Sequence, residues 1–145
     1  MSKKHQTLNL SHLEDLHTPG AGYDILRYVS LPDLLGQETE PILYFMGRNL
    51  ARKFEITSID EIVYLFEKLG WGTLDLIKQN KNMFVFHLLS DSVVLRLNAP
   101  FHVDFRFEAG FLAEAIQQVE GIECECVEEV NKRIHQIEFS VFITN

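Results

Sequence analysis

The sequence predicts an α+β domain in which a four-stranded antiparallel sheet carries a layer of helices on one face. Two stretches alternate apolar and polar residues in the manner of β-hairpins, at residues 72–89 and 122–143. A long amphipathic segment at residues 103–119 lies between them, and three or four helical segments come before them. Two hairpins separated by a long helix favour a two-layer domain, because each apolar face must be buried against another element.

Length, composition and charge restrict the class of protein. The chain has 145 residues, with 13 Lys and Arg against 21 Asp and Glu, so its formal net charge is −8. This excess of acid argues against a nucleic-acid partner, because binding to phosphates needs a basic surface. Hydrophobic residues make up 46% of the chain and 11 residues are Phe, which is enough apolar material for the core of one domain.

The sequence also predicts a cytoplasmic protein. The first residues are basic and polar, but they lead into no apolar run of the kind found in a secretory signal. No stretch approaches the roughly 20 apolar residues that a membrane-spanning helix requires. The two cysteines, Cys124 and Cys126, lie two positions apart and, without a secretory signal, indicate free thiols in a reducing compartment.

The beginning of the chain reads as a flexible N-terminal arm over residues 1–22, followed by a single domain over residues 23–145. A short helix is expected within the arm near residues 8–16, ended by a Pro-Gly turn. The arm is therefore expected to add little to the core.

The domain begins with two helical segments. Residues 23–35 form a helical connector, in which Pro32 predicts a break and Gly36 an end. A stronger helix begins near residue 39, since Pro41 in its first turn sacrifices no helical hydrogen bond. The residues that share one side of this helix, and are expected to face the core, are Ile42, Phe45, Met46, Asn49, Leu50 and Phe54.

Two small residues mark a second feature of this helix. Gly47 and Ala51 lie four positions apart and form a groove into which another element can approach closely. A glycine in the middle of a helix costs about 1 kcal/mol relative to alanine. We therefore expect a packing reason for Gly47, either inside one subunit or across a dimer interface.

The next helix has clear signals at both ends. Ser58 and Glu61 form a capping box, and Gly70 provides a left-handed stop. The apolar residues of its buried side are Ile59, Ile62, Val63, Phe66 and Leu69. A hairpin follows, with its turn at residues 79–82, after which residues 90–95 form either a helical turn or a continued strand.

The long helix at residues 103–119 is expected to cover the sheet, and Gly121 ends it. Its apolar stripe holds Phe105, Phe107, Ala109, Phe111, Leu112, Ala115, Ile116 and Val119. Four polar residues are expected to face away from the core: Arg106, Glu114, Gln117 and Gln118. In the final hairpin the alternation turns both cysteines inward, with the apolar residues, and turns Glu123, Glu125 and Glu129 to the other face.

Several residues are candidates for chemistry. Cys124 and Cys126 share the inward face of a strand, where burial makes thiols inert, and the spacing suits neither a disulfide nor a complete zinc site. His87 either faces a cavity or is an ordinary core or surface histidine. The acids of residues 120–129 either dock a basic partner or hold a cation, or they form a solvated sheet face. No catalytic triad or phosphate-binding glycine loop is visible.

Four strings of residues carry a family resemblance: 32–36 (PDLLG), 42–52 (ILYFMGRNLAR), 70–74 (GWGTL) and 107–113 (FEAGFLA). Together with the order of the elements, they resemble the YslB-like family of uncharacterised small proteins from Gram-positive bacteria. The resemblance runs from about residue 23 to the end of the chain. That family is similar in turn to the NO-signalling/Golgi-transport ligand-binding fold of TRAPP subunits, 4-vinyl-reductase domains and haem-NO-binding domains.

This resemblance implies an antiparallel sheet and a helical layer, often dimeric, around an apolar cavity that in TRAPP subunits can hold an acyl chain. Haem binding is not implied, because the Tyr-x-Ser-x-Arg motif that clamps the haem propionates has no counterpart here. In 4-vinyl-reductase domains the last hairpin tends to carry two cysteines around a glycine turn. The corresponding positions are Glu129, Arg133 and Ile137, so a metal or redox site is not expected there.

The resulting expectation is a non-enzymatic cytoplasmic binding module that forms a homodimer and holds a hydrophobic small molecule or docks a partner protein. No cofactor, metal site or catalytic residue is predicted. One alternative is a small enzyme or sensor that uses His87 or the cysteines, and another is a structural subunit of a larger assembly. The residues expected to line a ligand site are Tyr44, Trp71, Phe86, His87, Phe107 and Phe111.

Overall fold

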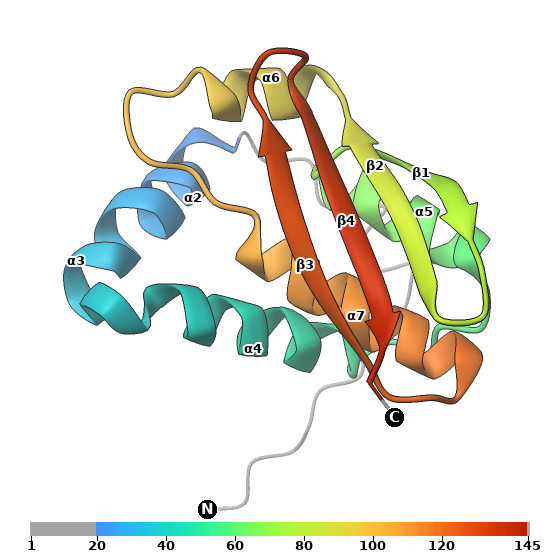
Figure 1. Cartoon of the computed structure of the whole chain (residues 1–145). Coiled ribbons are helices and arrows are strands. Elements are labelled where there is room, and N and C mark those ends of the chain that lie inside the picture. The colour runs from blue at the N-terminus through green and yellow to red at the C-terminus, as the bar shows by residue number, and fades with distance from the viewer. Residues whose placement is uncertain (1–19, 145) are drawn as a thin grey trace, which may run out of the picture.

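The computed structural model describes residues 20–144 and contains the predicted sheet (Figure 1). Four antiparallel strands lie in the order β1-β2-β4-β3, so the two hairpins join through the pairing of β2 with β4. The strands are β1 (Thr73–Gln79), β2 (Met83–Leu89), β3 (Cys124–Asn131) and β4 (Gln136–Ile143). The predicted fold class is therefore confirmed.

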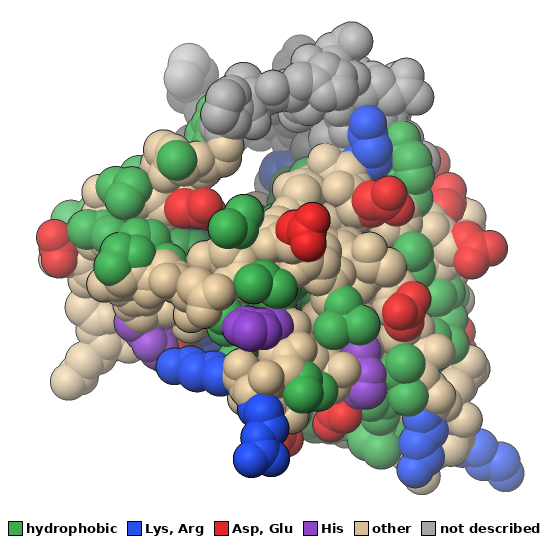
Figure 2. Space-filling model, turned by 90° about the horizontal axis from the view of Figure 1, so that it is seen from above, with side chains coloured by type: hydrophobic (Ala, Val, Ile, Leu, Met, Phe, Trp, Pro, Cys, Tyr) green, Lys and Arg blue, Asp and Glu red, His purple; other side chains and the backbone are tan. Residues whose placement is uncertain are grey.

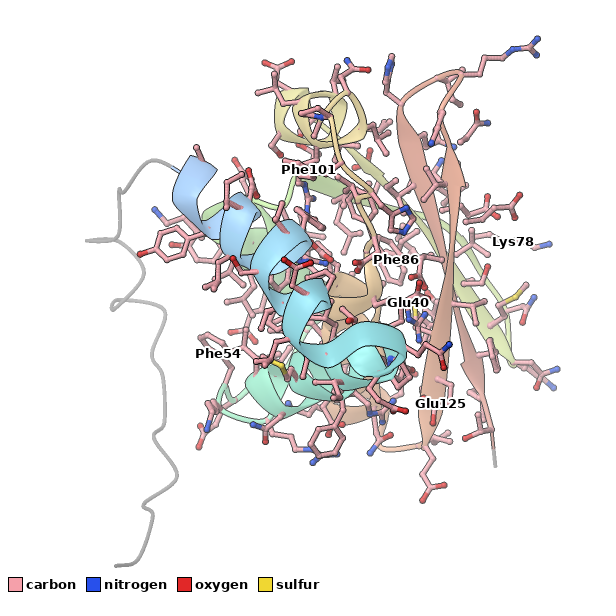
Figure 3. All side chains as sticks on the ribbon, turned by 90° about the vertical axis from the view of Figure 1, so that its left-hand side faces the viewer. Glu40, Phe54, Lys78, Phe86, Phe101 and Glu125 are labelled. Carbon is pink, nitrogen blue, oxygen red and sulfur yellow. The ribbon has the colours of Figure 1, made fainter. Side chains whose placement is uncertain are left out.

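The helices lie on one side of this sheet, while Lys78 points away on the other side (Figure 3). The predicted helix near residues 8–16 lies outside the described residues, as does most of the predicted arm. None of the helices among residues 20–144 is long and apolar enough to cross a membrane. The helical elements are α2 (Ala21–Ile25), η1 (Leu26–Ser30), α3 (Leu31–Leu35), η2 (Gly36–Glu38), α4 (Thr39–Ala51), α5 (Ile59–Lys68), α6 (Asp91–Leu97) and α7 (Arg106–Glu120).

The predicted break at Pro32 is wrong, because α2, η1 and α3 run on as one helical segment. The segment η1 is a π-helix, in which the N–H of Leu31 donates to the carbonyl of Leu26. In an ordinary α-helix the proline ring clashes with the carbonyl four residues earlier. A wider π-helical turn just before Pro32 relieves that conflict without ending the helix. Gly36 then ends α3 with a φ of 57°, as predicted.

The apolar stripe predicted for this helix is correct only in part. Phe54 is buried and Leu50 packs against the core, but α4 itself buries a different face. Phe45 is 61% exposed and Met46 is 42% exposed, whereas Leu43, Gly47 and Ala51 are buried. The reason is the close approach of α7 to the glycine. A Cβ added at Gly47 would overlap the carbonyl oxygen of Phe107.

A second glycine completes this contact between the two helices. A Cβ added at Gly110 of α7 would overlap the carbonyl oxygen of Tyr44 of α4, so the two helices cross backbone to backbone. The predicted groove of small residues on α4 is thus used inside one subunit. Helix α4 buries its glycine face and not its apolar face, because two glycines allow the backbones of α4 and α7 to come into direct contact.

The remaining helix signals act largely as expected. The N–H of Glu61 donates to Ser58 Oγ at 3.2 Å, and Gly70 has a φ of 79°. The carboxylate of Glu61 accepts from the N–H and the hydroxyl of Thr57, and these bonds lower the pKa of Glu61. The open choice for residues 90–95 resolves as helix, since Ser90 Oγ caps α6 by accepting from the N–H of Val93.

Helix α7 packs against the sheet and is more deeply buried than predicted. It begins at Arg106 rather than at residue 103, and every residue from 108 to 116 is buried. The expectation that Arg106 and Glu114 face away is wrong. Glu114 is 6% exposed because α4 covers its side of the helix. Gln117 and Gln118 are also half-buried, and both make hydrogen bonds to neighbouring elements.

The core lies between the sheet, α5 and α7, and phenylalanine is its most frequent residue. Phe86 of β2 and Phe139 of β4 are register partners, and both are fully buried. Phe66 of α5 meets Phe139 at a ring distance of 6.3 Å and Phe111 of α7 at 5.8 Å. These edge-on contacts connect the helical layer to the middle of the sheet.

The crossing of α4 and α7 yields a stability prediction. We expect Gly110→Ala to lower the free energy of unfolding by about 1–3 kcal/mol or more, because the new methyl group overlaps backbone that cannot move aside. Urea unfolding measures the change. Gly22→Ala is the matched control, because a Cβ at this helical position meets no atom within 4 Å. Equal stability of the two variants would contradict the prediction.

Candidate functional site

A fully buried carboxylate, Glu108, lies in the first turn of α7 between two arginines from other elements. Arg27 of η1 binds it in a bidentate manner, with N–O distances of 2.8 and 2.7 Å. Arg96 of α6 binds it at 2.7 Å. These three residues, with Tyr28 and Asp104, are referred to below as the Glu108 cluster.

Charge balance explains how a carboxylate is tolerated at this depth. Burial by itself would raise the pKa of Glu108, but the two guanidinium charges and their hydrogen bonds outweigh it and hold the pKa at about 2. The same carboxylate raises the pKa of both Arg27 and Arg96, against the effect of burial. All three groups are therefore charged at neutral pH.

The cluster joins four separate parts of the chain. Asp104, in the segment before α7, accepts from Arg27 through its side chain at 3.3 Å and through its carbonyl at 3.1 Å. The hydroxyl of Tyr28 donates to the same carbonyl at 3.2 Å. Arg96 also donates to the carbonyl of Trp71, at 3.1 Å. The N-terminal helices are thereby fixed to α6, to α7 and to the end of α5.

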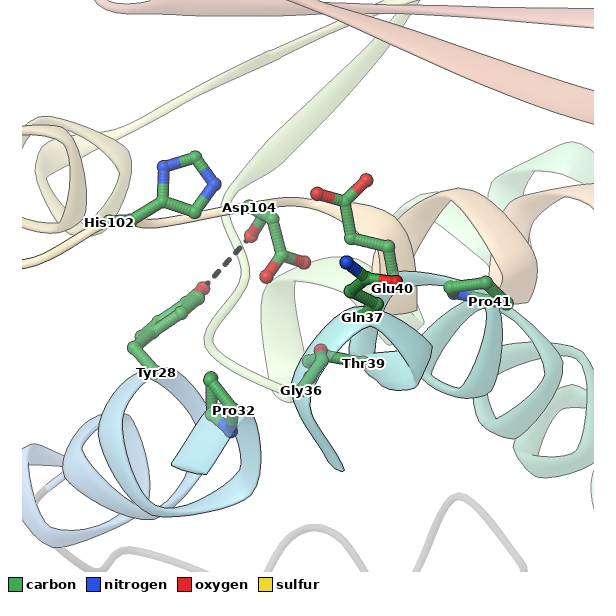
Figure 4. A pocket seen from close by; sticks show the side chains of 9 residues that line it. All are labelled: Tyr28, Pro32, Gly36, Gln37, Thr39, Glu40, Pro41, His102 and Asp104. Atoms are coloured by element: carbon green, nitrogen blue, oxygen red, sulfur yellow. Dashed lines mark hydrogen bonds between the residues drawn. The ribbon is translucent and has the colours of Figure 1, made fainter. Parts of the chain in front are cut away.

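A pocket of about 470 Å³ opens beside this cluster, and Tyr28 and Asp104 belong to both (Figure 4). One wall comes from α3, η2 and the start of α4, and the other from the segment that leads into α7. Figure 4 shows the side chains of Glu40, Asp104 and His102 around the same space. The lining residues are Tyr28, Pro32, Gly36, Gln37, Thr39, Glu40, Pro41, His102 and Asp104.

A second polar cluster lies where α4 meets the edge strand β3. The hydroxyl of Tyr44 donates to Glu125 at 2.5 Å and accepts from the N–H of Cys126 at 3.0 Å. Arg48 donates to the carbonyl of Cys124 at 2.9 Å. These bonds satisfy backbone groups of β3 that have no strand partner, which protects this edge from pairing with another chain. Burial and the bond to Glu125 raise the pKa of Tyr44 to about 12.

Two ion pairs connect this second cluster to α7. Arg48 Nε lies 3.2 Å from Glu114, and Arg106 lies 2.5 Å from Glu128. Glu128 shares the inward face with the cysteines rather than facing solvent, and burial raises its pKa despite the nearby Arg106. We assign this cluster a structural role, because its groups are occupied with one another and with the backbone.

The structure separates the six residues that were predicted to line a ligand site. Phe86 and Phe111 are fully buried in the core. Trp71 packs edge-on against Phe107 at 5.5 Å and against Phe111 at 5.1 Å. The other two lie elsewhere: Tyr44 binds the edge of β3, and His87 is on the outer face of the sheet. None of the six lines the pocket described above.

The candidate side chains for chemistry lie in surroundings that do not activate them. His87 Nε2 lies 3.1 Å from Glu138, its register partner on β4, at the exposed face. Cys124 and Cys126 are buried free cysteines, as predicted. Burial raises the pKa of both thiols, and that of Cys126 lies well above its usual value. No three His, Cys, Asp or Glu residues gather as a metal site within residues 20–144.

The Glu108 cluster was not foreseen, although one signal for it was present. Phe105, Glu108 and Leu112 have the spacing of a single helical stripe, so a carboxylate stands in an otherwise apolar row. A charge at such a position indicates a buried partner of opposite sign. The partners Arg27 and Arg96 had no comparable signal, since their contacts span 81 and 12 positions of the chain.

The fold is that of a known structural class. It is similar to the crystal structure of a vinyl-4-reductase family protein from Methanocaldococcus jannaschii, with a TM-score of 0.68 at 17% sequence identity. The match covers 94% of this chain and 89% of that one. At this identity the similarity concerns the fold.

The chain belongs to the family described as protein of unknown function DUF2507, which matches residues 20–142. It is 34% identical over 133 residues to the uncharacterized protein YslB of Bacillus subtilis, covering 92% of this chain and 90% of that protein. It is also 24% identical over 107 residues to the uncharacterized protein MJ1642 of Methanocaldococcus jannaschii, covering 73% of this chain and 65% of that protein. The predicted resemblance to YslB is confirmed, whereas the likeness to TRAPP subunits stays a prediction.

The Glu108 cluster yields a second stability prediction. We expect Glu108→Gln to lower the free energy of unfolding by about 3–5 kcal/mol, because two buried arginines lose the charge that balances them. Chemical unfolding measures the loss. Glu138→Gln removes a carboxylate from the exposed His87 pair and should cost less than about 1 kcal/mol. Equally small losses of unfolding free energy in the two variants would contradict the prediction that the Glu108 cluster stabilises the fold.

Acid should weaken the fold through the same residue. Because the folded pKa of Glu108 is lowered to about 2, the stability from its ionised form is complete above the ordinary glutamate pKa of about 4.3 and is lost as the pH falls toward 2. Urea unfolding at several pH values compares the natural chain with Glu108→Gln. The natural chain should lose stability more steeply between about pH 5 and pH 3. Parallel curves would count against this role of Glu108.

Proposed function

We propose that this protein is a non-enzymatic binding module that holds a small molecule in the pocket beside the Glu108 cluster. The observation that carries the proposal is the pocket itself, whose volume of about 470 Å³ lies in the range of small-molecule sites. Two of its lining residues, Tyr28 and Asp104, are held in place by the buried cluster. A wall that is fixed before the ligand arrives lowers the entropic cost of binding.

The lining suggests a ligand with an apolar body and a cationic or hydrogen-bond-donating group. Pro32, Pro41 and the ring of Tyr28 supply apolar surface. Asp104 and Glu40 supply carboxylates, and Asp104 is already paired with Arg27. Glu40 forms no ion pair with any other residue of the part described, so its charge is available to a cationic group.

The surroundings of the reactive side chains support binding over catalysis. The lining residues include no cysteine or serine, and the hydroxyl of Thr39 already donates to the carbonyl of Gly36 at 2.7 Å. Cys124 and Cys126 are buried with raised pKa values, which disfavours the reactive thiolate. His87 lies on the outer face of the sheet and does not line the pocket.

We place the ligand at the edge of the helical layer, and not in the interior between the sheet and the helices where the sequence predicted it. The interior aromatic residues Phe86 and Phe111 have no exposed surface, and Trp71 and Phe107 pack against one another. A hydrophobic molecule at that position would have to displace a packed core. We further propose a cytoplasmic location, which the two free cysteines support.

The pocket proposal is tested with simple amines as probes. We expect tyramine and phenethylamine to shift the backbone amide signals of residues 36–40 and 102–104 in a ¹⁵N-labelled sample, because their ammonium groups meet Glu40. Phenylacetate, which has a similar body and the opposite charge, should shift them far less. Glu40→Gln should weaken amine binding by about tenfold, the effect of losing one charge-assisted hydrogen bond.

Two matched variants separate the pocket from other surfaces. Gln37→Trp places a large ring at an exposed lining position and should abolish the shifts. Gln79→Trp makes the same change at an exposed position of β1 and should leave them intact. The proposal is overturned if none of the probes shifts these signals, or if the shifts survive Gln37→Trp.

A further inference from the structure

The outer side of the helical segment 21–35, formed by α2, η1 and α3, carries large apolar side chains that no described residue covers. Tyr23, Leu26 and Val29 are 63%, 52% and 37% exposed, and they follow one another at a spacing of three residues. Leu34, near the end of the segment, is 79% exposed. Figure 2 shows hydrophobic side chains gathered at its left, the side on which α2 and α3 lie in Figure 1.

The inner side of the same segment is already occupied. Arg27 binds Glu108 there, and Tyr28 is buried and donates to the carbonyl of Asp104. A helix at the surface of a protein normally has one side that packs on the core and an opposite side that is polar. A helical segment with large apolar residues on its outer side as well is the kind that another element covers.

The chain has an apolar segment directly next to this surface. Residues 1–19 precede the described part and lie outside the residues that the family matches. Within the helix that the sequence predicts there, Leu10, Leu13 and Leu16 also follow one another at a spacing of three residues. Only residues 17–20, which contain the Pro-Gly turn, separate this helix from α2. A connection of about two to five residues is the usual length between two antiparallel helices.

We propose that residues 8–16 fold back as a helix antiparallel to the segment 21–35 and cover its outer side. In such a hairpin the residue numbers of facing positions have a constant sum, because the two helices run in opposite directions from the turn. The facing pairs are Leu16 with Tyr23, Leu13 with Leu26, and Leu10 with Val29. The two numbers add up to 39 in each pair, so one register places all three leucines on exposed apolar residues.

Charges at the open end of this hairpin support the same arrangement. Lys3 and Lys4 precede the predicted helix, so in the hairpin they lie beyond Val29. Asp33 and Glu38 are exposed in that direction, and neither forms an ion pair with another residue of the part described. Opposite charges therefore meet where the apolar contact ends.

Engineered disulfides in the full chain test the register. Leu13→Cys with Leu26→Cys should form an intramolecular disulfide under mild oxidation, because facing positions bring the Cα atoms within about 7 Å. Leu13→Cys with Leu34→Cys is the matched control, since Leu34 is more exposed but lies roughly 12 Å further along the helix. Mass spectrometry should find at least about a fivefold higher yield for the first pair, independent of protein concentration. The natural thiols Cys124 and Cys126 are buried and should not compete.

Dye binding by the full chain provides a second readout that needs no new cysteine. Leu13→Asp should uncover the apolar surface and raise the fluorescence of the hydrophobic dye ANS by about threefold or more. Ser11→Asp is the matched control, because it adds the same charge on the opposite side of the predicted helix and should leave the fluorescence unchanged.

Three results would each overturn the proposal. The first is a disulfide yield at positions 13 and 26 no higher than that of the control pair. The second is a disulfide at these positions that links two chains, which would identify a second copy as the element that covers the surface. The third is dye fluorescence that Leu13→Asp leaves unchanged.

Discussion

The buried ion cluster around Glu108 is the constraint on which the arrangement of the helical layer depends. A carboxylate with no exposed surface must have its charge balanced where it lies, and here two arginines from different elements provide that balance. Because Arg27 comes from η1 and Arg96 from α6, satisfying Glu108 fixes both elements against α7. The same bonds hold Tyr28 and Asp104, so the shape of the pocket follows from the balance of charge beneath it.

The backbone contact between α4 and α7 determines what the surface offers. With glycines at positions 47 and 110 the helices approach more closely than side chains would allow. This orientation brings Tyr44 and Arg48 to the edge of β3, where they satisfy its free backbone groups. It also leaves Phe45 and Met46 on the outside. One packing contact thus covers the edge of β3 and leaves apolar side chains of α4 exposed.

The sequence predicted the strands well and the helix faces less well. Alternation in residues 122–143 indicated the inward cysteines and the outward Glu125 and Glu129, because strand periodicity is local. The apolar stripe on α4 did not predict the buried side of the helix, because apolar residues at helical spacing do not show which side packs against α7. Of the aromatic residues predicted to line a ligand site, Phe86 and Phe111 are buried in the core and Trp71 packs against Phe111, contacts that residue type alone does not predict. The pocket has no signal in the sequence, because its walls come from segments more than 60 positions apart.

By itself the sequence determined the order of the strands and of the longer helices, the capping box at Ser58, the stop signals at Gly36 and Gly70, and membership of an α+β family. These features depend on neighbouring residues and on short periodicities, so they can be read from the chain directly. Only the tertiary structure decided which side of α4 is buried, which arginines balance Glu108, and where a pocket opens. Those outcomes depend on contacts between distant segments, whose geometry exists only once the helices have packed on the sheet.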